Sequence, residues 1–257
     1  MTVSIAHMGK SKWVLQELCG TTKHYQFGYE VPKNVRHAYE LDQLQGNTKW
    51  ADAMRSELKS LDELKVFRPL RRGQPPPANF KLIPLLWVFT IKPDGTHKAR
   101  CVTGGHVTGP MEDNVFAAVV KMPNIQLVLL LVALNDLQVL MGDIKNAYLY
   151  AKMHEKVFII AGEEFDPLQG LILVVKGAWY GLKSSGNHFF AHLSDNIRKQ
   201  SFVPSKPDKC VWFREMHGWN DYLLTHVDNI NVAARDAVEV IKDLQRTYVI
   251  KKIDPPM

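Results

Sequence analysis

The chain has 257 residues, of which 46% are hydrophobic and 23% are charged. This balance is typical of a folded globular protein with one large or two small domains, and it excludes an intrinsically disordered chain. Lysine and arginine number 32 against 26 acidic residues, so the formal charge of +6 favours polyanionic partners only mildly.

The cysteines and the apolar segments exclude several other classes of protein. Cys19, Cys101 and Cys210 are far apart and have no paired spacing typical of a zinc site or a disulfide framework, so we expect a reducing compartment. The N-terminal residues lack the apolar run of a secretory signal. The most apolar stretch, residues 127–134, is too short for a membrane-spanning helix, which needs about 20 residues. We therefore expect no membrane partner.

The first part of the chain changes character near Thr48. Residues 1–45 mix aromatic, charged and glycine residues without a sustained period, and we expect a leader of weak structure there. From Thr48, which can cap a helix, apolar residues recur at three- and four-residue steps as far as Leu64. The Gly- and Pro-rich residues 73–77 interrupt regular structure.

A hairpin, a helix and a strand are expected next. Residues 85–92 and 98–103 are rich in strand formers and flank a Pro-Asp-Gly turn signal, which predicts a β-hairpin. The apolar residues 123–135, with proline in the first turn, predict a buried helix. Residues 138–143 predict a short buried strand, and residues 146–152 a return to helix.

The C-terminal part alternates between strands and helices. Strands are expected at residues 157–161, 171–176 and 211–214, a hairpin at 222–233, and helices at 186–200 and 237–248. No internal repeat is present, and this order of elements indicates a mixed α+β fold.

Two aspartates each follow an apolar strand. Asp143 ends the run 139–143 and Asp228 ends the run 222–228. Phosphoryl transfer with divalent metal ions uses carboxylates held on neighbouring strands, because hard cations prefer oxygen ligands. The separation of 85 residues is compatible with adjacent strands. A strand-end aspartate is more often a turn or cap residue, so from these features alone both interpretations remain open.

The sequence around both aspartates resembles a known family. Residues 143–149, Asp-Ile-Lys-Asn-Ala-Tyr-Leu, resemble the first catalytic motif of copia-type LTR retrotransposon reverse transcriptases, and residues 226–229, His-Val-Asp-Asn, resemble their Tyr-Val-Asp-Asp box. Further stretches are similar to the family in the same order, from Gly28 to Met257: the W-x-x-A-M-x-x-E helix at 50–57, the fingers hairpin at 88–100, F-A-P-V-V at 116–120 and L-Y-G-L-K at 179–186.

The resemblance implies a fold and a domain organisation. It implies that residues 46–257 form the fingers and palm of a right-hand polymerase, an α+β fold whose antiparallel, RRM-like palm sheet is backed by helices. The thumb and RNase H domain of the family would lie beyond Met257, and residues 1–45 would be an upstream leader. An unrelated RNA-binding module with the same sheet would need aromatic pairs on its central strands, which carry carboxylates instead.

The resemblance also implies a metal site. Asp143 and Asp228 would be catalytic residues that ligate Mg²⁺ or Mn²⁺, with help from the backbone carbonyl of Ile144. The family usually has an aspartate at the position of Asn229 and a tyrosine at that of His226. Asparagine keeps an oxygen ligand but loses a charge, which predicts weaker metal binding.

The nucleotide is expected to meet residues on the hairpin and around the palm. Lys92, Lys98 and Arg100 would contact the triphosphate, since cationic side chains, arginine above all, bind phosphate well; the alternative is a solvated hairpin face. Residues that would contact the nucleotide or template are Tyr148 under the sugar, Tyr180, Gly181 and Lys183. Tyr148 could equally be a core residue, and Lys183 a charge at a helix start.

The function implied is RNA-directed DNA polymerisation. Its partners would be an RNA or DNA primer–template and deoxynucleoside triphosphates, and its compartment a cytoplasmic retroelement particle or the nucleus. The alternative, suggested by Asn229, is a catalytically inactive relic with residual nucleic-acid binding. The sequence leaves the oligomeric state open.

Overall fold

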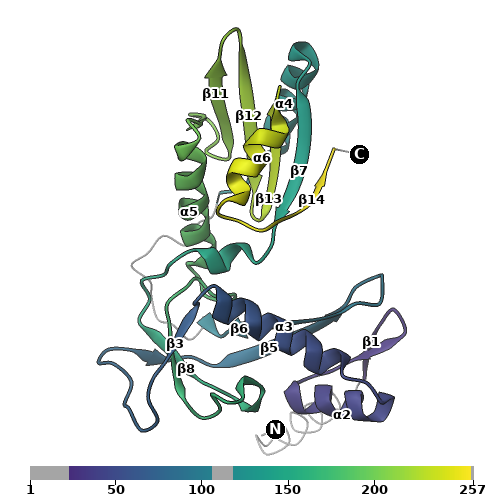
Figure 1. Cartoon of the computed structure of the whole chain (residues 1–257), viewed down its shortest axis with the longest axis vertical. Coiled ribbons are helices and arrows are strands. Elements are labelled where there is room, and N and C mark those ends of the chain that lie inside the picture. Colours follow the sequence, from purple (N-terminus) through teal and green to yellow (C-terminus); the bar gives the residue numbers. More distant parts are fainter. Residues whose placement is uncertain (1–22, 106–117, 256–257) are drawn as a thin grey trace, which may run out of the picture. The chain divides into compact units, whose positions relative to one another are not determined.

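The computed structural model describes residues 23–105 and 118–255, which form two compact units. Of the described residues, 23–57 and 87–101 form the first unit, and 58–86, 102–105 and 118–255 form the second. Figure 1 shows the elements of both. Three elements, at residues 49–63, 85–91 and 97–103, contribute residues to both units.

The first unit combines short strands with helices. It contains β1 (His24–Gln26), β2 (Tyr29–Val31), α2 (Val35–Gln45), the first turns of α3 (Lys49–Glu63), and most of β5 (Leu85–Ile91) and β6 (His97–Thr103). Strands β5 and β6 pair with each other, which confirms the predicted hairpin. Its core consists of Val31, Ala38, Leu41, Trp50, Met54, Phe89, Ile91 and Ala99.

The expectation of a weakly structured leader is wrong for residues 24–45. They form a hairpin and a helix, and Val31, Ala38 and Leu41 are buried in the core. Only a few apolar residues of α2 face that core, so its amphipathic period was too weak to recognise in the sequence. Residues 1–22, including Cys19, lie outside the described part of the chain.

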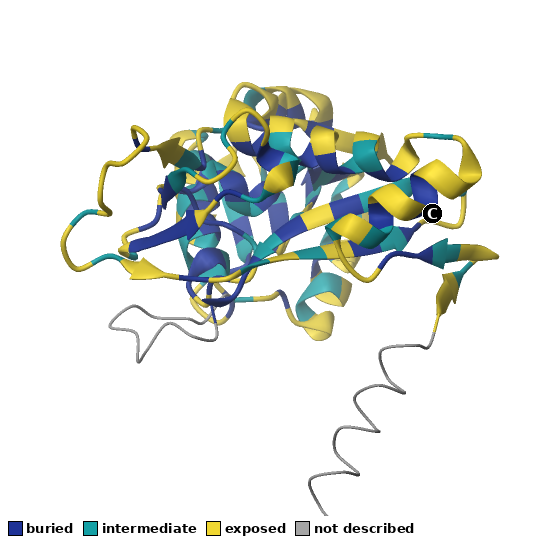
Figure 2. Ribbon diagram, turned by 90° about the horizontal axis from the view of Figure 1, so that it is seen from below, coloured by how far each residue is buried: buried dark blue, intermediate teal, exposed yellow. Residues whose placement is uncertain are grey.

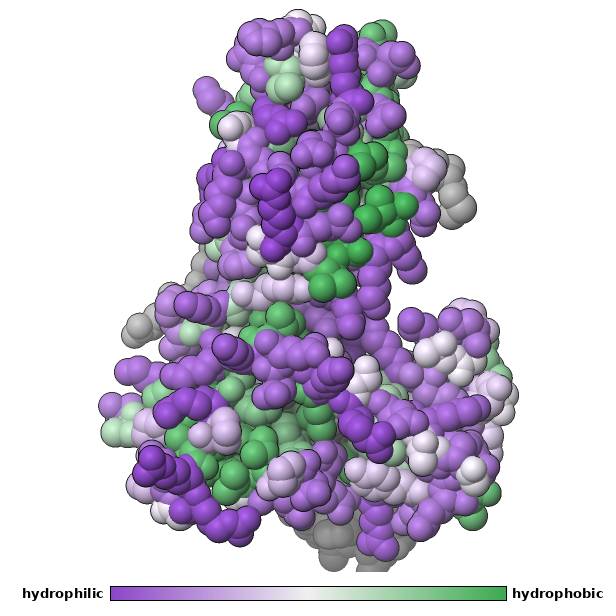
Figure 3. Space-filling model, viewed as in Figure 1, coloured by the Kyte–Doolittle hydropathy of each residue, from purple (hydrophilic) through white to green (hydrophobic). Residues whose placement is uncertain are grey.

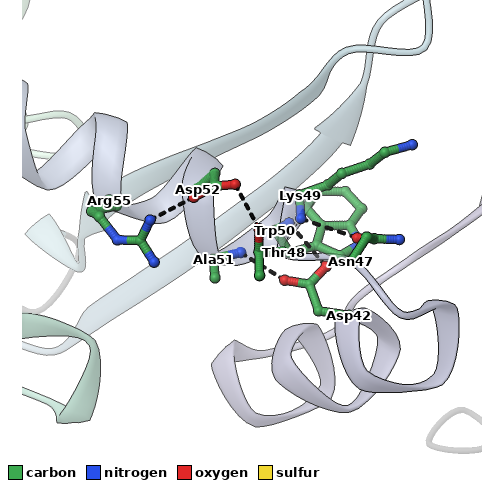
Figure 4. Close-up of polar contacts among 8 residues, drawn as sticks. All are labelled: Asp42, Asn47, Thr48, Lys49, Trp50, Ala51, Asp52 and Arg55. Atoms are coloured by element: carbon green, nitrogen blue, oxygen red, sulfur yellow. Dashed lines mark hydrogen bonds and ion pairs between the residues drawn. The ribbon is translucent and has the colours of Figure 1, made fainter.

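The start of α3 is capped by a residue from the preceding helix. The helix begins directly after Thr48, as predicted, but the Thr48 hydroxyl donates to Asp52. The Asp42 carboxylate, only 5% exposed, accepts hydrogen bonds from the backbone amides of Trp50 (3.1 Å) and Ala51 (2.9 Å), as Figure 4 shows. Helix N-termini leave such amides unpaired, so Asp42 ties α2 to α3.

The second unit is organised around a six-stranded sheet in which all neighbours are antiparallel. The order is β10 (Val203–Pro204), β11 (Val211–Met216), β12 (Trp219–His226), β13 (Asn229–Ala234), β7 (Gln138–Ile144) and β14 (Ile250–Asp254). With α5 (Ser185–Lys199) and α6 (Ala237–Gln245), the succession β7-α5-β12-β13-α6-β14 is a βαββαβ arrangement, and the predicted α+β fold class is confirmed.

Helices cover both faces of this sheet (Figure 1). Side chains of α5 and α6 pack on one face with Ile144, Leu223, Ile230 and Val232. On the other face α4 (Met122–Asn135) packs through Val128 against Leu224 and Ala233. Figure 2 shows buried (dark blue) and exposed (yellow) residues along both strands and helices. Because side chains alternate along a strand, Asp143 lies on the α4 face and Ile144 on the other.

A smaller sheet belongs to the same unit. Its order is β3 (Phe67–Pro69), β9 (Ile172–Val175), β8 (Val157–Ile160) and β4 (Lys81–Leu82), and the 3-10 helices η2 (Ala147–Tyr150) and η3 (Glu163–Phe165) flank these strands in the chain. The predicted strands β8 and β9 are confirmed. The helix expected at residues 146–152 is only the short η2, and α6 ends three residues before Tyr248.

Helix α4 differs from its prediction. It spans the expected residues, but Val128 is its one buried residue, whereas Leu127, Leu130 and Leu134 are 54%, 56% and 71% exposed. An apolar composition predicts burial without specifying which partner provides it, and the described contacts of α4 lie on the side that faces the sheet. No helix in the described ranges is long and apolar enough to cross a membrane.

The N-terminus of α4 is held by a buried aspartate. Asp208 accepts hydrogen bonds from the backbone amides of Lys121 (3.2 Å) and Cys210 (2.9 Å) and from the Asn124 side chain (2.6 Å). Burial raises the pKa of the Asp208 carboxyl, but the hydrogen bonds from Cys210, Asn124 and Lys121 together outweigh it, so the pKa is lowered. The ionised carboxylate therefore joins α4 to the segment before β11.

We expect Asp42→Ala to lower the free energy of unfolding by about 1–2 kcal/mol, because two helix amides lose their acceptor. The matched control is Asp52→Ala, which removes an exposed partner of Arg55 and should cost less than about 1 kcal/mol. Urea unfolding followed by tryptophan fluorescence measures both variants. Equal effects would contradict the capping role of Asp42.

We expect the stabilisation by Asp208 to depend on pH. A carboxyl whose pKa is lowered by folding stabilises the protein above its unfolded pKa of about 3.9, and this contribution is lost as the pH falls through the folded value. Asp208→Asn should cost about 2–3 kcal/mol at pH 7 and progressively less below about pH 4. Urea unfolding of the native chain and Asp208→Asn across this pH range tests the prediction, with Asp195→Asn, at an exposed aspartate, as the control. A difference in the free energy of unfolding that does not change with pH would refute it.

Candidate active site

The two aspartates predicted to ligate metal lie on neighbouring strands. In the pairing of β7 with β13, Asn229 stands directly opposite Asp143. The backbone amide of Ile144 donates a hydrogen bond of 2.8 Å to the carbonyl oxygen of Asp228. This backbone contact at the end of the sheet places Asp228 beside the strand end that carries Asp143, which lies 85 residues earlier in the sequence. Both carboxylates are half-buried, so they are accessible to a ligand from solvent.

Asp228 is held by a tight turn. Val227 and Asp228 form the two-residue loop between β12 and β13, and Val227 has a φ of 57°. Two-residue hairpins favour positive φ at their first loop position, but a β-branched side chain is strained there. Such strain persists only where the surrounding structure enforces it, here through the flanking strand pairs, and it occurs often at functional sites.

Asn229 contacts Asp228 directly. Its side-chain nitrogen donates a hydrogen bond of 3.1 Å to Oδ1 of Asp228. A carboxylate can only accept, so the amide presents its nitrogen to Asp228 and keeps its oxygen for another partner. The Asn229 side chain therefore uses one acceptor oxygen of Asp228, whereas an aspartate at this position would place a second negative charge beside it.

Lys251 is a residue of this site that our sequence analysis missed. In the pairing of β14 with β7 it stands directly opposite Asp143, so Asn229, Asp143 and Lys251 form a row across three strands on one face of the sheet. The short strand β14, Ile-Lys-Lys-Ile-Asp, was not expected, because its apolar residues do not alternate with polar ones and four of its five residues are exposed. Gly142 permits the close pairing, because a Cβ there would lie 2.6 Å from the Ile250 side chain.

The predicted nucleotide-contacting tyrosines lie near each other. The ring of Tyr148, on η2, is 5.8 Å from that of Tyr180 and 6.0 Å from that of Phe189. Tyr148 is half-buried, so its ring is partly a core residue and partly accessible. The structure brings Tyr148 and Tyr180 together, while Lys183 lies exposed just before α5.

The backbone around Gly181 is tightly constrained. The carbonyl of Tyr180 accepts hydrogen bonds from the Thr103 amide (2.7 Å) and the Thr103 hydroxyl (2.9 Å). Gly181 has a φ of +94°, and a Cβ there would lie 2.0 Å from the Thr103 carbonyl oxygen. Glycine is required here both for its conformation and for this close approach.

The predicted triphosphate contacts lie on the hairpin of the first unit. Lys92 and Arg100 are exposed and Lys98 is half-buried. Lys98 and Arg100 flank the buried Ala99, so they share the outward face of β6. These residues belong to a different unit from the aspartates, and their contact with a triphosphate stays a prediction.

One motif is only partly described. Phe116 and Ala117 of the F-A-P-V-V-like stretch lie outside the described residues. Val119 forms an isolated antiparallel bridge with His226, and Val120 is buried. This stretch therefore pairs with β12 beside the turn that carries Asp228.

The donor set around the aspartates consists of oxygen ligands. Within the residues that the structure describes, no group of three or more His, Cys, Asp or Glu side chains is arranged to hold a metal ion. Two carboxylates, the amide oxygen of Asn229 and backbone carbonyls are ligands of the hard kind that Mg²⁺ and Mn²⁺ prefer. The residues fit such an ion, with one carboxylate fewer than the family box supplies.

Comparison with known proteins identifies the family. Residues 74–254 match the family model described as reverse transcriptase (RNA-dependent DNA polymerase). The chain is 28% identical over 218 residues to the retrovirus-related Pol polyprotein from transposon TNT 1-94 of Nicotiana tabacum, an alignment that covers 79% of this chain and 16% of that protein. It is 26% identical over 205 residues to the Transposon Ty1-ER2 Gag-Pol polyprotein of Saccharomyces cerevisiae, covering 76% and 11%.

A solved structure of the same class is also similar. The foamy viral protease-reverse transcriptase in complex with double-stranded DNA aligns with a TM-score of 0.44 and 16% identity, covering 82% of this chain and 32% of that one. The chain spans less than a fifth of the length of either polyprotein that it matches.

The fold and the family match together define the class of this protein. The chain belongs to the reverse transcriptase family. It is a reverse transcriptase domain of the kind found in the Pol polyproteins of copia-type retrotransposons, as the motifs around Asp143 and Asp228 predicted.

We expect Gly181→Ala to lower the free energy of unfolding by about 3 kcal/mol or more, because the new methyl group overlaps backbone atoms of Thr103. Gly218→Ala is a matched control, since Gly218 also has a positive φ, +90°, but has open space around a Cβ. It should lower the free energy of unfolding by only about 1 kcal/mol. Thermal or urea unfolding compares the two. Similar losses would mean that the close approach at Gly181 is not rigid.

Proposed function

We propose that the chain catalyses RNA-directed DNA polymerisation, adding deoxynucleotides to the 3′ end of a primer paired with an RNA or DNA template. The observation that supports this most directly is the pairing of β7 with β13, through which the strands carrying Asp143 and Asp228 lie side by side. Family membership supports the reaction type. The activity of the whole polyprotein is part of the proposal, because the chain spans only a small share of its relatives.

Asp143 and Asp228 hold Mg²⁺ or Mn²⁺ in this proposal, with the amide oxygen of Asn229 and the carbonyl of Ile144 as further donors. When bound, the ion supplies charge neutralisation at the reacting phosphate and activation of the primer hydroxyl. Lys251, opposite Asp143 on β14, adds a positive charge on the same face of the sheet. This charge partly offsets that of the aspartates and attracts the triphosphate.

The remaining residues bind and orient the substrates. Lys92, Lys98 and Arg100 contact the triphosphate through charge-assisted hydrogen bonds. The Tyr148 ring packs under the sugar, supported by its neighbour Tyr180. The close backbone at Gly181 and the exposed Lys183 contact the base and the template.

A second candidate function is nucleic-acid binding without catalysis. The observation that favours it is the hydrogen bond from the Asn229 side-chain amide to Asp228. Asn229 is neutral where the family has a second carboxylate, and its amide occupies an acceptor oxygen of Asp228. Several kcal/mol of transition-state stabilisation in phosphoryl transfer depend on correctly placed charge and metal. Binding through the basic hairpin would survive and would weaken with salt.

Primer extension on poly(rA)/oligo(dT) with Mg²⁺ or Mn²⁺ tests the proposal. We expect the native chain to extend the primer, Asp143→Asn to lower the rate by about 1,000-fold or more, and Asn229→Asp to raise it by about tenfold. Extension that persists in Asp143→Asn would exclude the metal role of Asp143. Absence of extension in both the native chain and Asn229→Asp, with salt-sensitive binding of the duplex retained, would favour the second function.

Thermal unfolding with and without Mg²⁺ provides a readout that does not need activity. Asn229→Asp brings two carboxylates together without a hydrogen bond, so the variant should be less stable than the native chain in EDTA and gain more from Mg²⁺. The matched control is Asn220→Asp, on the same β-hairpin at its other end. An equal Mg²⁺ response in all three proteins would exclude a metal site at Asn229.

A further inference from the structure

Strand β14 is held weakly along most of its length. It lies at the edge of the six-stranded sheet, and its register with β7 shifts between Lys251 and Asp254. Lys252, within this shift, has a φ of 52°, which is unfavourable for a residue other than glycine. Regular pairing before the shift is limited to Ile250 and Lys251. The position of Lys251 opposite Asp143 therefore depends on how the chain is held just before the strand.

Tyr248, two residues before β14, is buried and holds this part of the chain. It is 2% exposed, and its ring makes edge-on contacts with the rings of Tyr150 on η2 (5.1 Å between centroids) and His192 on α5 (5.7 Å). The amide of Val249 donates a hydrogen bond of 3.0 Å to the hydroxyl of Tyr150, and the carbonyl of Val249 accepts one of 2.8 Å from the amide of Lys145. These contacts fix the two residues that lead into β14.

The hydroxyl group of Tyr248 takes part in a hydrogen-bond network on α5. The Asn196 side-chain nitrogen donates to this hydroxyl over 3.0 Å and to the carbonyl of His192 over 2.8 Å. The orientation of the Asn196 amide is fixed, because its oxygen accepts from Lys199 and Thr247, both at 3.4 Å. The Tyr248 hydroxyl therefore donates its own hydrogen to Nδ1 of His192, 2.8 Å away, in preference to the His192 carbonyl, 3.4 Å away.

This arrangement requires a neutral His192, because Nδ1 can accept a hydrogen bond only while it carries no proton. Burial lowers the pKa of His192, Lys199 on the same helix lowers it further, and Asp195 raises it by less. The titratable groups that face this network from the other elements are the hydroxyls of Tyr248 and Tyr150. Burial raises the pKa of Tyr248, so its hydroxyl stays protonated. His192 is therefore neutral at pH 7 and is the group that titrates first as the pH falls.

The network lies close enough to the surface for protons to reach it. His192 is half-buried, and Figure 3 shows mainly hydrophilic (purple) side chains where Figure 1 draws α5 and α6. A protonated His192 would donate to Tyr248, whose hydroxyl hydrogen would be left with the distant His192 carbonyl, already bonded to Asn196. Protonation thus gives this hydrogen a poor acceptor and places a charge in a partly buried site.

We infer that the hydrogen bond from Tyr248 to a neutral His192 anchors the start of β14, and that protonation of His192 loosens this anchor. Through it the two residues position Lys251 opposite Asp143. Because the pKa of His192 is lower in the folded chain than its unfolded value of about 6.5, the anchor is complete above about pH 6.5 and is lost as the pH falls through the folded value. The anchor is a property of the fold, whereas its effect on catalysis rests on the proposed function.

Amide hydrogen exchange of the full chain, measured by mass spectrometry at about pH 7.5 and about pH 5, tests the anchor. Each rate is divided by the intrinsic rate at the same pH, so that only changes in local opening remain. We expect residues 249–254 to lose about fivefold in protection at the lower pH, as the loss of one hydrogen bond implies. Residues 211–216, in β11 of the same sheet, should keep their protection, which confirms that the chain stays folded.

Three variants separate the anchor from general loosening. His192→Asn keeps an acceptor for the Tyr248 hydroxyl but is not protonated, so β14 should be equally protected at both pH values. Tyr248→Phe should have the lower protection already at the higher pH. Tyr150→Phe is the matched control, because it removes a hydroxyl that holds Val249 but leaves the pH response of the native chain. Protection of β14 that is independent of pH in the native chain, or a native pH response in His192→Asn, overturns the inference.

Primer extension shows whether the anchor matters for catalysis. Between about pH 7.5 and about pH 6 the native rate should fall more steeply than that of His192→Asn, because Lys251 moves with β14 only in the native chain. Identical pH profiles in two active proteins would overturn the positioning of Lys251 by His192. Absence of extension in both proteins would count against the proposed function alone, since the exchange measurement decides on the anchor without any activity.

Discussion

The pairing of β7 with β13 is the interaction on which the candidate site depends. Each residue of β7 from Gln138 to Asp143 has a fixed partner on β13, and the ladder is extended by the contact between Ile144 and Asp228. Ile144, Ile230 and Val232 bury one side of these strands beneath α5 and α6. A shift of register by one residue would turn Asp143 into this core and expose Ile144, at a cost of several buried side chains. The hydrophobic core thereby determines that Asp143 faces away from α5 and α6.

The electrostatics of the site follow from the same ladder. Asn229 and Lys251 flank Asp143 because β13 and β14 are its neighbours, so the row across the sheet holds one carboxylate, one amide and one ammonium group. Asp228 supplies the second carboxylate from the turn. The negative charge near a divalent cation at this site would therefore be smaller than if residue 229 were a second aspartate beside Asp228. Of the two functions proposed, catalysis depends on this charge and nucleic-acid binding alone does not, so Asn229 is the residue that best distinguishes them.

The sequence predicted most of the helices and strands, and it indicated the two aspartates of the candidate site. Runs of strand-forming and apolar residues predicted β5 to β9 and β11 to β13, although β7 was expected to end one residue early, at Asp143. Asp143 and Asp228 were recognised because each follows an apolar run. Lys251 was missed because its place beside Asp143 depends on a strand pair between distant segments, which periodicity does not report. Asp42 was missed for the same reason, since its capping contacts cross from one helix to the next. The residues that the sequence did not reveal are those whose positions depend on contacts between distant segments, because local propensities do not report such contacts.

The burial predicted for α4 was wrong in a way that is itself informative. The sheet requires only the inner residues Ile125, Val128 and Val132, and the Asp208 hydrogen bonds already hold the start of the helix. Polar side chains at Leu127, Leu130 and Leu134 would leave this packing intact and would remove an exposed apolar surface that favours aggregation. Contacts within the described chain thus account for the inner side of α4 alone. The number of apolar residues in a helix indicates that it packs on something, but only the tertiary contacts decide how many of its sides are buried.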